Sequence, residues 1–288
     1  MTSPLIKLDW SLLPLGKLPF QPDSRDLKLA DYIDKSKLIS TASCPLAHDW
    51  EAVPNCEGRK PDLDEDPLAN NHANCCVFSA PGHMVKMIGE QTNAPIIITP
   101  DMVLDAYGIS GYRLDSKLFD NGFNIRAMLK LWKLLGLYGT KALAYVLVNW
   151  KDPEELALAS WLGCGTIGGF ALPKASQGQV DAKGRQLWSV PPGGFPEGQG
   201  PGTWGNHAIW TCKPSPKLDG GNSWGQKTYW TMEWGFECCD ERWMVLVDKW
   251  KLTTGRAPNG FDFDQLLTDV KVRASTQSIT DPIKTFLL

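Results

Sequence analysis

The first half of the chain carries its hydrophobic residues mainly at helical spacing. Between Ile125 and Leu135 they recur every three or four positions, which predicts an amphipathic helix. Capping and helix-starting residues predict three more helices: from about Cys75 to Gly89, from Pro100 to Tyr107 and from Pro153 to Gly163. The first of these contains a Pro-Gly pair, which predicts a kink or break within it.

The second half carries its hydrophobic residues in short runs that are typical of strands. We expect strands at Thr166–Leu172, Ala208–Lys213 and Thr228–Glu233, and an earlier one at Ala142–Val148. Residues 190–206 are rich in proline and glycine and predict a long irregular loop that leads into His207. Helices first and strands later favour the α+β fold class.

Three segments follow from these patterns. Residues 1–60 are rich in proline and aspartate and predict an extended N-terminal arm, with a turn at 22–26 and a short helix near 29–33. Residues 61–250 form the expected main domain, mainly helical over 61–163 and mainly β over 164–250. Residues 251–288 predict a C-terminal tail with one short helix at about 263–270.

Composition excludes several classes of function. The net charge is −3 and no basic block occurs, so a nucleic-acid partner is not expected. The longest apolar run, Ala142 to Val148, is too short to span a bilayer, and the first residues lack the features of a signal peptide, so we expect a product made in the cytoplasm. Thirteen tryptophans predict an indole-rich core, with a substrate or partner groove as the alternative.

The eight cysteines do not form a convincing metal site. His72 with Cys75 and Cys76 lacks a second pair of ligands, so we expect neither a metal nor another cofactor. A Cys44–Cys56 disulfide would need an oxidising compartment, which the absence of a secretory signal does not support.

Cys75 is a candidate nucleophile because it stands where a helix is expected to begin. A helix N-terminus and a nearby imidazolium both stabilise a thiolate. Of the four histidines, His83 lies about 12 Å further along the same helix, and His72 and His48 lie in irregular segments. His207, at the start of a predicted strand, is therefore the candidate base.

Asn222 and Trp224 follow His207 at a spacing that would allow Asn222 to orient the imidazole and Trp224 to shield the bond between them. The side-chain oxygen of Asn222 can accept the ring N–H of a histidine, and an indole at Trp224 can shield that bond from water. Taken singly, a cysteine in an apolar stretch, a histidine and an asparagine after two glycines are more often structural. Their order and spacing together favour a catalytic arrangement.

Three motifs resemble those of the papain-like cysteine peptidase superfamily. The run 73–79, Ala-Asn-Cys-Cys-Val-Phe-Ser, resembles the segment around the family's nucleophile. Asn206-His207-Ala208-Ile209 resembles the segment with its base, and Asn222-Ser223-Trp224-Gly225 matches its Asn-Ser-Trp-Gly motif. The run 69–75, followed by Gly82-His83, looks more closely like a divergent branch found in bacteria, phages and prophages.

The resemblance implies a helical subdomain, with a central cysteine-bearing helix, packed against an antiparallel β subdomain. It also implies a Cys75–His207–Asn222 triad. The family usually has glutamine six residues before its nucleophile as an oxyanion donor, but here that position is Ala69, and Asn70 or Asn71 could take its place. Cys76 replaces the usual tryptophan and could form a disulfide with Cys75 or compete with it as a thiol.

Two functions follow from the resemblance. The first is a thiol hydrolase, encoded by a phage or prophage, that cleaves an amide bond in a peptide substrate in the host cytoplasm. The second is a non-enzymatic phage virion protein, a capsid or tail component with a degenerate site, whose partners are other phage structural subunits. Fold alone does not decide between them.

Overall fold

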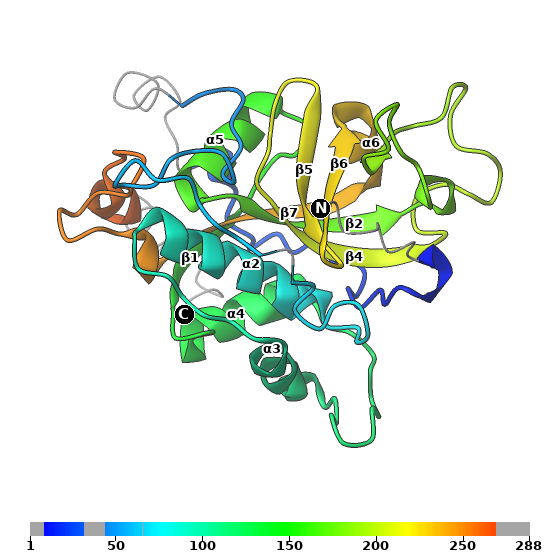
Figure 1. Cartoon of the computed structure of the whole chain (residues 1–288), viewed down its shortest axis with the longest axis horizontal. Coiled ribbons are helices and arrows are strands. Elements are labelled where there is room, and N and C mark those ends of the chain that lie inside the picture. The colour runs from blue at the N-terminus through cyan, green and yellow to red at the C-terminus, as the bar shows by residue number, and fades with distance from the viewer. Residues whose placement is uncertain (1–8, 32–43, 65, 269–288) are drawn as a thin grey trace, which may run out of the picture.

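The computed structural model describes residues 9–31, 44–64 and 66–268, which form a seven-stranded sheet with helices on both sides (Figure 1). The order of the strands in the sheet is β1-β7-β2-β4-β5-β6-β3. All neighbouring pairs are antiparallel except β3 and β6. The expected α+β class is confirmed.

The helices of the first half agree closely with the sequence patterns. They are α2 (Cys76–Gln91), α3 (Pro100–Tyr107), α4 (Ile125–Leu135) and α5 (Pro153–Gly163). The caps explain three of the starts, because side chains of Thr99, Asn124 and Asp152 accept hydrogen bonds from the first-turn N–H groups. Helix α2 continues through Pro81 without ending, although a break was one of the two expected outcomes.

The strands that the patterns predict are present as β1 (Ala142–Leu147), β2 (Thr166–Leu172), β4 (Gly205–Thr211) and β6 (Gln226–Thr231). Three strands and a helix have no counterpart in the prediction: β3 (Leu187–Trp188), β5 (Leu218–Ser223), α6 (Met232–Cys238) and β7 (Cys239–Val247). Strand β5 was not predicted because it contains Asp-Gly-Gly-Asn, a composition typical of a turn. Strand β7 lies inside the sheet and is buried almost throughout, so it lacks an alternating pattern.

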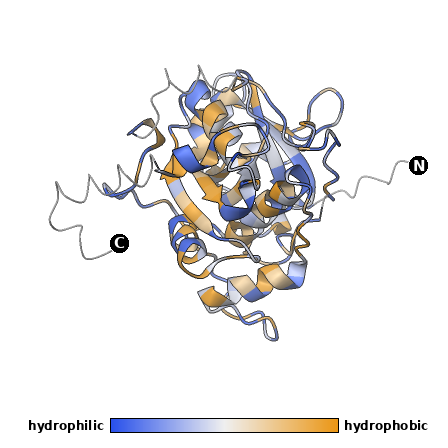
Figure 2. Ribbon diagram, turned by 90° about the vertical axis from the view of Figure 1, so that its left-hand side faces the viewer, coloured by the Kyte–Doolittle hydropathy of each residue, from blue (hydrophilic) through white to orange (hydrophobic). Residues whose placement is uncertain are grey.

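The sheet separates two hydrophobic clusters. Figure 2 shows that the apolar segments are concentrated in the helices and strands of the body. Helix α2 packs into the first cluster together with Ala208 and Trp210 of β4. Ile209, the residue between them, belongs to the second cluster, which is rich in tryptophan. This division follows from the alternation of side chains along a strand. The expected tryptophan core is confirmed, because eight indoles are less than 2% exposed: Trp50, Trp132, Trp188, Trp210, Trp230, Trp234, Trp243 and Trp250.

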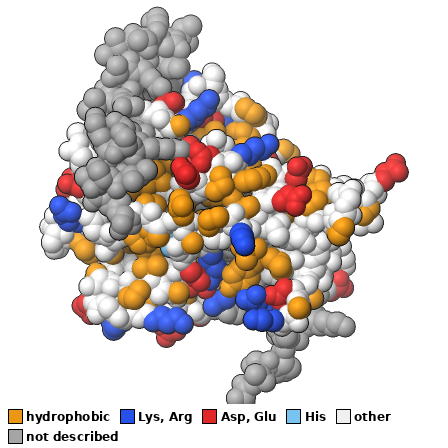
Figure 3. All heavy atoms as spheres, turned by 90° about the horizontal axis from the view of Figure 1, so that it is seen from above, with side chains coloured by type: hydrophobic (Ala, Val, Ile, Leu, Met, Phe, Trp, Pro, Cys, Tyr) orange, Lys and Arg blue, Asp and Glu red, His pale blue; other side chains and the backbone are white. Residues whose placement is uncertain are grey.

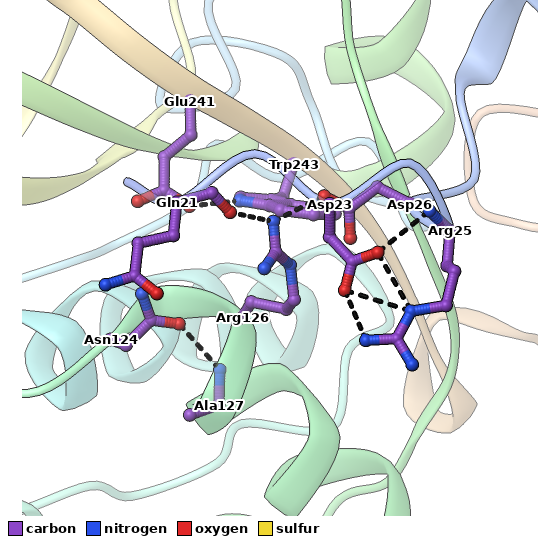
Figure 4. Close-up of polar contacts among 9 residues, drawn as sticks. All are labelled: Gln21, Asp23, Arg25, Asp26, Asn124, Arg126, Ala127, Glu241 and Trp243. Atoms are coloured by element: carbon purple, nitrogen blue, oxygen red, sulfur yellow. Dashed lines mark hydrogen bonds and ion pairs between the residues drawn. The ribbon is translucent and has the colours of Figure 1, made fainter. Parts of the chain in front are cut away.

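The N-terminal segment is an extended arm over its described part and is attached by polar contacts. Arg126 of α4 forms an ion pair with Asp26 and donates to the Gln21 carbonyl oxygen at 2.6 Å (Figure 4). Its guanidinium also lies 5.4 Å from the ring centre of Phe20 and 5.9 Å from that of Trp243. The expected turn at 22–26 is present, and the expected helix near 29–33 is a single 3-10 turn at Leu29–Asp31, with residues 32 and 33 outside the described part.

The last described residues include the start of the expected C-terminal helix, over 263–268, and its predicted end lies outside the described part. Cys44 and Cys56 are free thiols, as are Cys75 and Cys76. On the face seen in Figure 3, apolar side chains gather between scattered charges of both signs, without a continuous basic patch.

Candidate active site

The start of α2 is positioned by a polar network around Asn74. Its backbone N–H donates to the Asp120 carboxylate at 2.9 Å, and its side-chain N–H group donates to the Asp120 carbonyl oxygen at 2.8 Å. Asp120 also accepts from the Tyr107 hydroxyl at 2.8 Å. The loop before Asn74 contains Leu68 and Ala69 at φ angles of 51° and 65°, a strained conformation for residues with a Cβ atom.

Cys75 is the N-cap residue of α2 and is fully buried. Its sulfur lies 3.4 Å from the Ser79 hydroxyl and 3.8 Å from the Leu68 carbonyl oxygen. Burial raises the pKa of Cys75 to about 12, and the Ser79 hydroxyl opposes this while the Asp120 carboxylate adds to it. At neutral pH the Cys75 side chain is therefore a thiol.

His207 lies near the start of β4 and is also fully buried. Its ring stacks on Trp224, with 4.1 Å between ring centres and 16° between planes. Nε2 is hydrogen-bonded to the Ser223 hydroxyl at 2.5 Å, while Nδ1 has no partner among the described residues. Burial lowers the pKa of His207 to about 3, so the imidazole is neutral at physiological pH.

The structure does not bring the three expected triad residues together. Asn222 pairs with Trp210 across β4 and β5, and alternation along the strands places Ser223, rather than Asn222, on the face of His207. The side-chain oxygen of Asn222 is buried without a described partner. Among the described contacts, none joins the Cys75 sulfur to His207. Trp224 stacks on the imidazole, but the Asn222–His207 bond that it was expected to shield is absent among the described contacts.

The two candidate oxyanion residues differ in their surroundings. Asn70 is 3% exposed, and its side-chain oxygen has no described partner. Asn71 is exposed, and its side-chain oxygen is bonded to Nδ1 of His72 at 2.9 Å. Asn70 is thus the better placed of the two to complete a buried site.

The N-terminal arm crosses the candidate site. The Leu15 N–H donates to the Asn74 side-chain oxygen at 2.9 Å, beside the cysteines, and the Lys17 N–H donates to the Asn206 carbonyl oxygen at 3.3 Å, beside His207. Between them, Gly16 is so close to the Asn74 carbonyl that a Cβ atom would lie 1.7 Å from its oxygen. The Trp224 indole N–H donates to the Pro14 carbonyl oxygen at 3.2 Å. Residues 14–17 therefore bridge the two elements that carry the thiols and the imidazole.

A buried ion pair also holds residues 14–17 against the sheet. The Lys17 ammonium lies 2.8 Å from Asp240 and 3.3 Å from Glu241, and its side chain is fully buried. Burial raises the pKa of Glu241, and the Lys17 charge acts in the opposite direction. This ion pair adds to the hydrogen bonds that hold residues 14–17 between the start of α2 and β4.

Other features lie away from this site. A largely apolar cavity of about 400 Å³ opens between α3 and α4, lined in part by Met102, Ile109 and Trp132, and includes none of the candidate residues. Within the described residues there is no cluster of three or more His, Cys, Asp or Glu suited to a metal ion. No described helix is long and apolar enough to cross a membrane.

Comparison with solved structures identifies the fold. The chain is similar to xylellain, a cysteine protease from Xylella fastidiosa, with a TM-score of 0.57 and 16% sequence identity over 81% of this chain and 96% of that protein. The likeness supports the papain-like fold expected from the motifs, and at this identity it shows the fold alone. No protein-family model and no characterised sequence matches the chain.

Three residues of the site escaped sequence reasoning: Asn74, Ser223 and Gly16. The hydroxyl of Ser223 was visible inside the Asn-Ser-Trp-Gly motif, and strand alternation would have pointed to it once β5 was known. Gly16 carried a weaker signal, because a single glycine in an extended arm predicts a close approach without naming the partner.

Proposed function

We propose that the protein is a papain-type thiol hydrolase that cleaves an amide bond in a peptide. A cysteine thiol at the start of α2 is the nucleophile and His207 is the base. The observation that carries this proposal is the state of His207: Nε2 is bonded, Trp224 covers the ring, and Nδ1 is left without a described partner. Nδ1 is therefore the ring nitrogen that is free to take a proton. Because alternation along β4 places this imidazole on the face opposite α2, a thiol of α2 reaches it only after the two elements rearrange.

The reaction follows from these positions. Nδ1 of His207 takes the thiol proton, the sulfur forms a bond to the substrate carbonyl carbon, and the carbonyl electron pair moves to oxygen. Asn70 and backbone N–H groups at the helix start stabilise the oxyanion. When the C–N bond breaks, the leaving amine takes the proton from His207. Water then hydrolyses the thioester with His207 again as base, which restores the thiol.

Access to the site depends on the arm. Residues 14–17 lie where the substrate chain must enter, so the enzyme is inactive until this segment is displaced or cut. The neutral thiols and the neutral imidazole of the closed state fit this interpretation, because water and substrate are needed to stabilise a thiolate–imidazolium pair.

The test is covalent labelling with a peptidyl vinyl sulfone. We expect adduct on wild type after limited proteolysis of the arm, slower labelling of His207→Gln, and no adduct on a variant with alanine at both 75 and 76. Cys212→Ala is the matched control, because that buried thiol lies directly after the end of β4, outside the candidate site, and should not affect labelling. If the double variant labels as fast as wild type, the hydrolase proposal is wrong.

A non-enzymatic role is the second candidate, and the closed, uncharged site favours it. A phage virion component, capsid or tail, would use the fold as a building block with other structural subunits as partners. Mass spectrometry of purified particles from a host that carries the gene tests this. Absence of the protein from particles, together with labelling as described above, would exclude the structural role.

A further inference from the structure

The side chain of Lys17 ends inside the protein between two carboxylates. Its nitrogen lies 2.8 Å from Oδ2 of Asp240 and 3.3 Å from Oε1 of Glu241. It also donates to the Leu18 carbonyl oxygen at 3.2 Å. The side chains of Lys17 and Glu241 are fully buried, and that of Asp240 is 29% exposed. Desolvation offsets much of the attraction between charges at this depth, so stability alone is a weak reason to bury these three groups together.

A bulge in β7 brings both carboxylates to the same lysine. Two consecutive residues of β2 pair with Glu241 and Cys239, so Asp240 between them is an extra residue of β7. In a regular strand, neighbouring residues such as 240 and 241 point to opposite faces of the sheet. A bulge changes the direction of a side chain, and here Lys17 contacts two consecutive acidic residues.

Gly169 of the neighbouring strand β2 provides the space for this arrangement. A Cβ atom there would lie 2.2 Å from Cε of Lys17, 2.6 Å from Cγ of Glu241 and 2.9 Å from Oδ1 of Asp240. All three side chains therefore pack against the Gly169 backbone, with no room for even a methyl group. Groups held together in this way react as if at a very high concentration, with effective molarities of about 10⁵ M or more in well-oriented cases.

Two carboxylate oxygens next to Lys17 are not committed to the fold by hydrogen bonds. Oδ1 of Asp240 and Oε1 of Glu241 are buried, and neither accepts a hydrogen bond from a described residue. The other oxygen of Glu241 accepts from the Trp243 indole N–H at 2.7 Å, which fixes the direction of the carboxylate (Figure 4). Burial raises the pKa of Glu241, so this group can hold a proton. Glu241 is therefore placed to pass a proton between the Lys17 nitrogen and an oxygen of Asp240.

We propose that the Lys17 nitrogen and the Asp240 carboxyl carbon join in an amide bond, a cross-link between the arm and β7, with Glu241 as the proton carrier. The ammonium gives one proton to the Asp240 carboxylate, and the freed nitrogen lone pair forms a bond to Cγ. A second proton passes from the nitrogen through Glu241 to the same Asp240 oxygen, whose bond to Cγ then breaks.

The reaction is balanced by the groups that the structure holds. One ammonium and one carboxylate become one amide and one molecule of water, Glu241 returns to its initial state, and nothing is oxidised or reduced. The exposed part of the Asp240 side chain gives the water a path to solvent. Conversion of two charges into a neutral amide also removes their desolvation cost. The bond does not depend on the hydrolase function proposed above.

A second lysine between two carboxylates provides a comparison within the same molecule. The Lys213 nitrogen lies 3.0 Å from Asp49 and 2.7 Å from Glu51. Glu51 also pairs with Lys227 at 3.1 Å, and although burial opposes this effect, the two lysines lower the pKa of Glu51. The Asp49 side chain is 38% exposed. Because Glu51 stays ionised and Asp49 is hydrated, we expect an ordinary ion pair at Lys213 and no amide.

The mass of the intact, reduced and denatured wild-type chain tests the bond. We expect it to be lower than the mass of the sequence by one molecule of water. Trypsin cuts after lysine only when its side chain is free, so we expect a branched peptide that is uncut at Lys17 and joined to residues 228–242. Asp240→Ala should have its full mass and should be cut at Lys17. Glu241→Gln should form the bond more slowly by about 100-fold or more, because the proton carrier is lost.

Asp49→Ala is the matched control and should lose water as the wild type does. A wild-type chain of full mass that is cut at Lys17 overturns the proposal, and so does a loss of water that maps to Lys213. Bond formation in Glu241→Gln at the wild-type rate overturns the role of Glu241. If Asp240→Ala lacks the wild-type circular dichroism spectrum, Asp240→Asn replaces it. Its carboxamide should release ammonia instead of water and give a product with the mass of the cross-linked wild type.

Discussion

The Ser223 hydroxyl holds the imidazole of His207, while the neighbouring Asn222 offers its side-chain oxygen to no described partner. We expect Ser223→Ala to lower the free energy of unfolding by about 1–2 kcal/mol, because it leaves Nε2 of a buried ring without a partner. Urea unfolding at pH 7 measures this. Asn222→Ala is the matched comparison, and we expect a smaller loss. An unchanged unfolding free energy in Ser223→Ala would contradict this role of the Ser223 hydroxyl.

The candidate residues themselves were only partly predictable. The sequence patterns favoured His207 over the other three histidines as a candidate base, and the motif placed Trp224 close enough in sequence to lie near it; the two rings do stack. The residue at which the first turn of α2 begins could not be predicted from the local sequence. That start is set by contacts of Asn74 with a residue 46 positions away.

At the scale of elements, helices were predicted better than strands for a physical reason. Helices α3, α4 and α5 carry local signals, since their caps and apolar spacing lie within their own sequence. Strands β5 and β7 depend on partners elsewhere in the chain: β5 is built from turn-forming residues, and β7 lies between β1 and β2 in the sheet. Local patterns cannot report such pairing.

The arm is the element whose position decides access to the site, and Gly16 is its most sensitive residue. A Cβ atom there would lie 1.7 Å from the Asn74 carbonyl oxygen, a backbone atom that cannot rotate away. We expect Gly16→Ala to displace residues 14–17 and to increase cleavage of the arm by trypsin at low enzyme concentration. Gly108→Ala is the control, because a Cβ atom at Gly108 meets nothing within 4 Å. Unchanged cleavage in Gly16→Ala would mean that the arm tolerates the side chain in place.

For the whole molecule, buried histidines predict loss of stability in acid. Burial lowers the pKa of His207 to about 3 and those of His48 and His83 to about 4, whereas an unfolded histidine titrates near 6.5. Between these values the unfolded chain binds more protons, so the stabilisation is complete above about pH 6.5 and declines as the pH falls toward 4. We expect the urea midpoint to fall from pH 7 to pH 4.5.

A histidine variant isolates this effect from the carboxylates that titrate in the same range. His83→Gln should reduce the difference in unfolding free energy between pH 7 and pH 4.5, because one buried neutral imidazole is removed. His72→Gln is the control, since His72 is exposed. An equal pH dependence in both variants would exclude His83 as a source of the acid sensitivity.

The contribution of the Lys17–Glu241 ion pair to the free energy of unfolding should depend on pH in a defined way. Lys17→Met leaves Glu241 buried without its nearest cation and should cost about 3–5 kcal/mol of unfolding free energy at pH 7. Because burial already raises the pKa of Glu241, removal of Lys17 raises it further. A group with a raised pKa stabilises the fold below its unfolded value and loses that contribution as the pH rises through the folded value.

The loss of unfolding free energy in Lys17→Met should therefore be smaller at pH 4.5 than at pH 7, since protonation of Glu241 removes the unpaired charge. The double variant Lys17→Met with Glu241→Gln should recover much of the lost stability at pH 7 but should not restore the attachment of the arm through this ion pair. Unfolding midpoints and arm proteolysis, measured on the same samples, separate the two effects. If the double variant regains full protection of the arm, hydrogen bonds of residues 14–17 are sufficient to close the site without the ion pair.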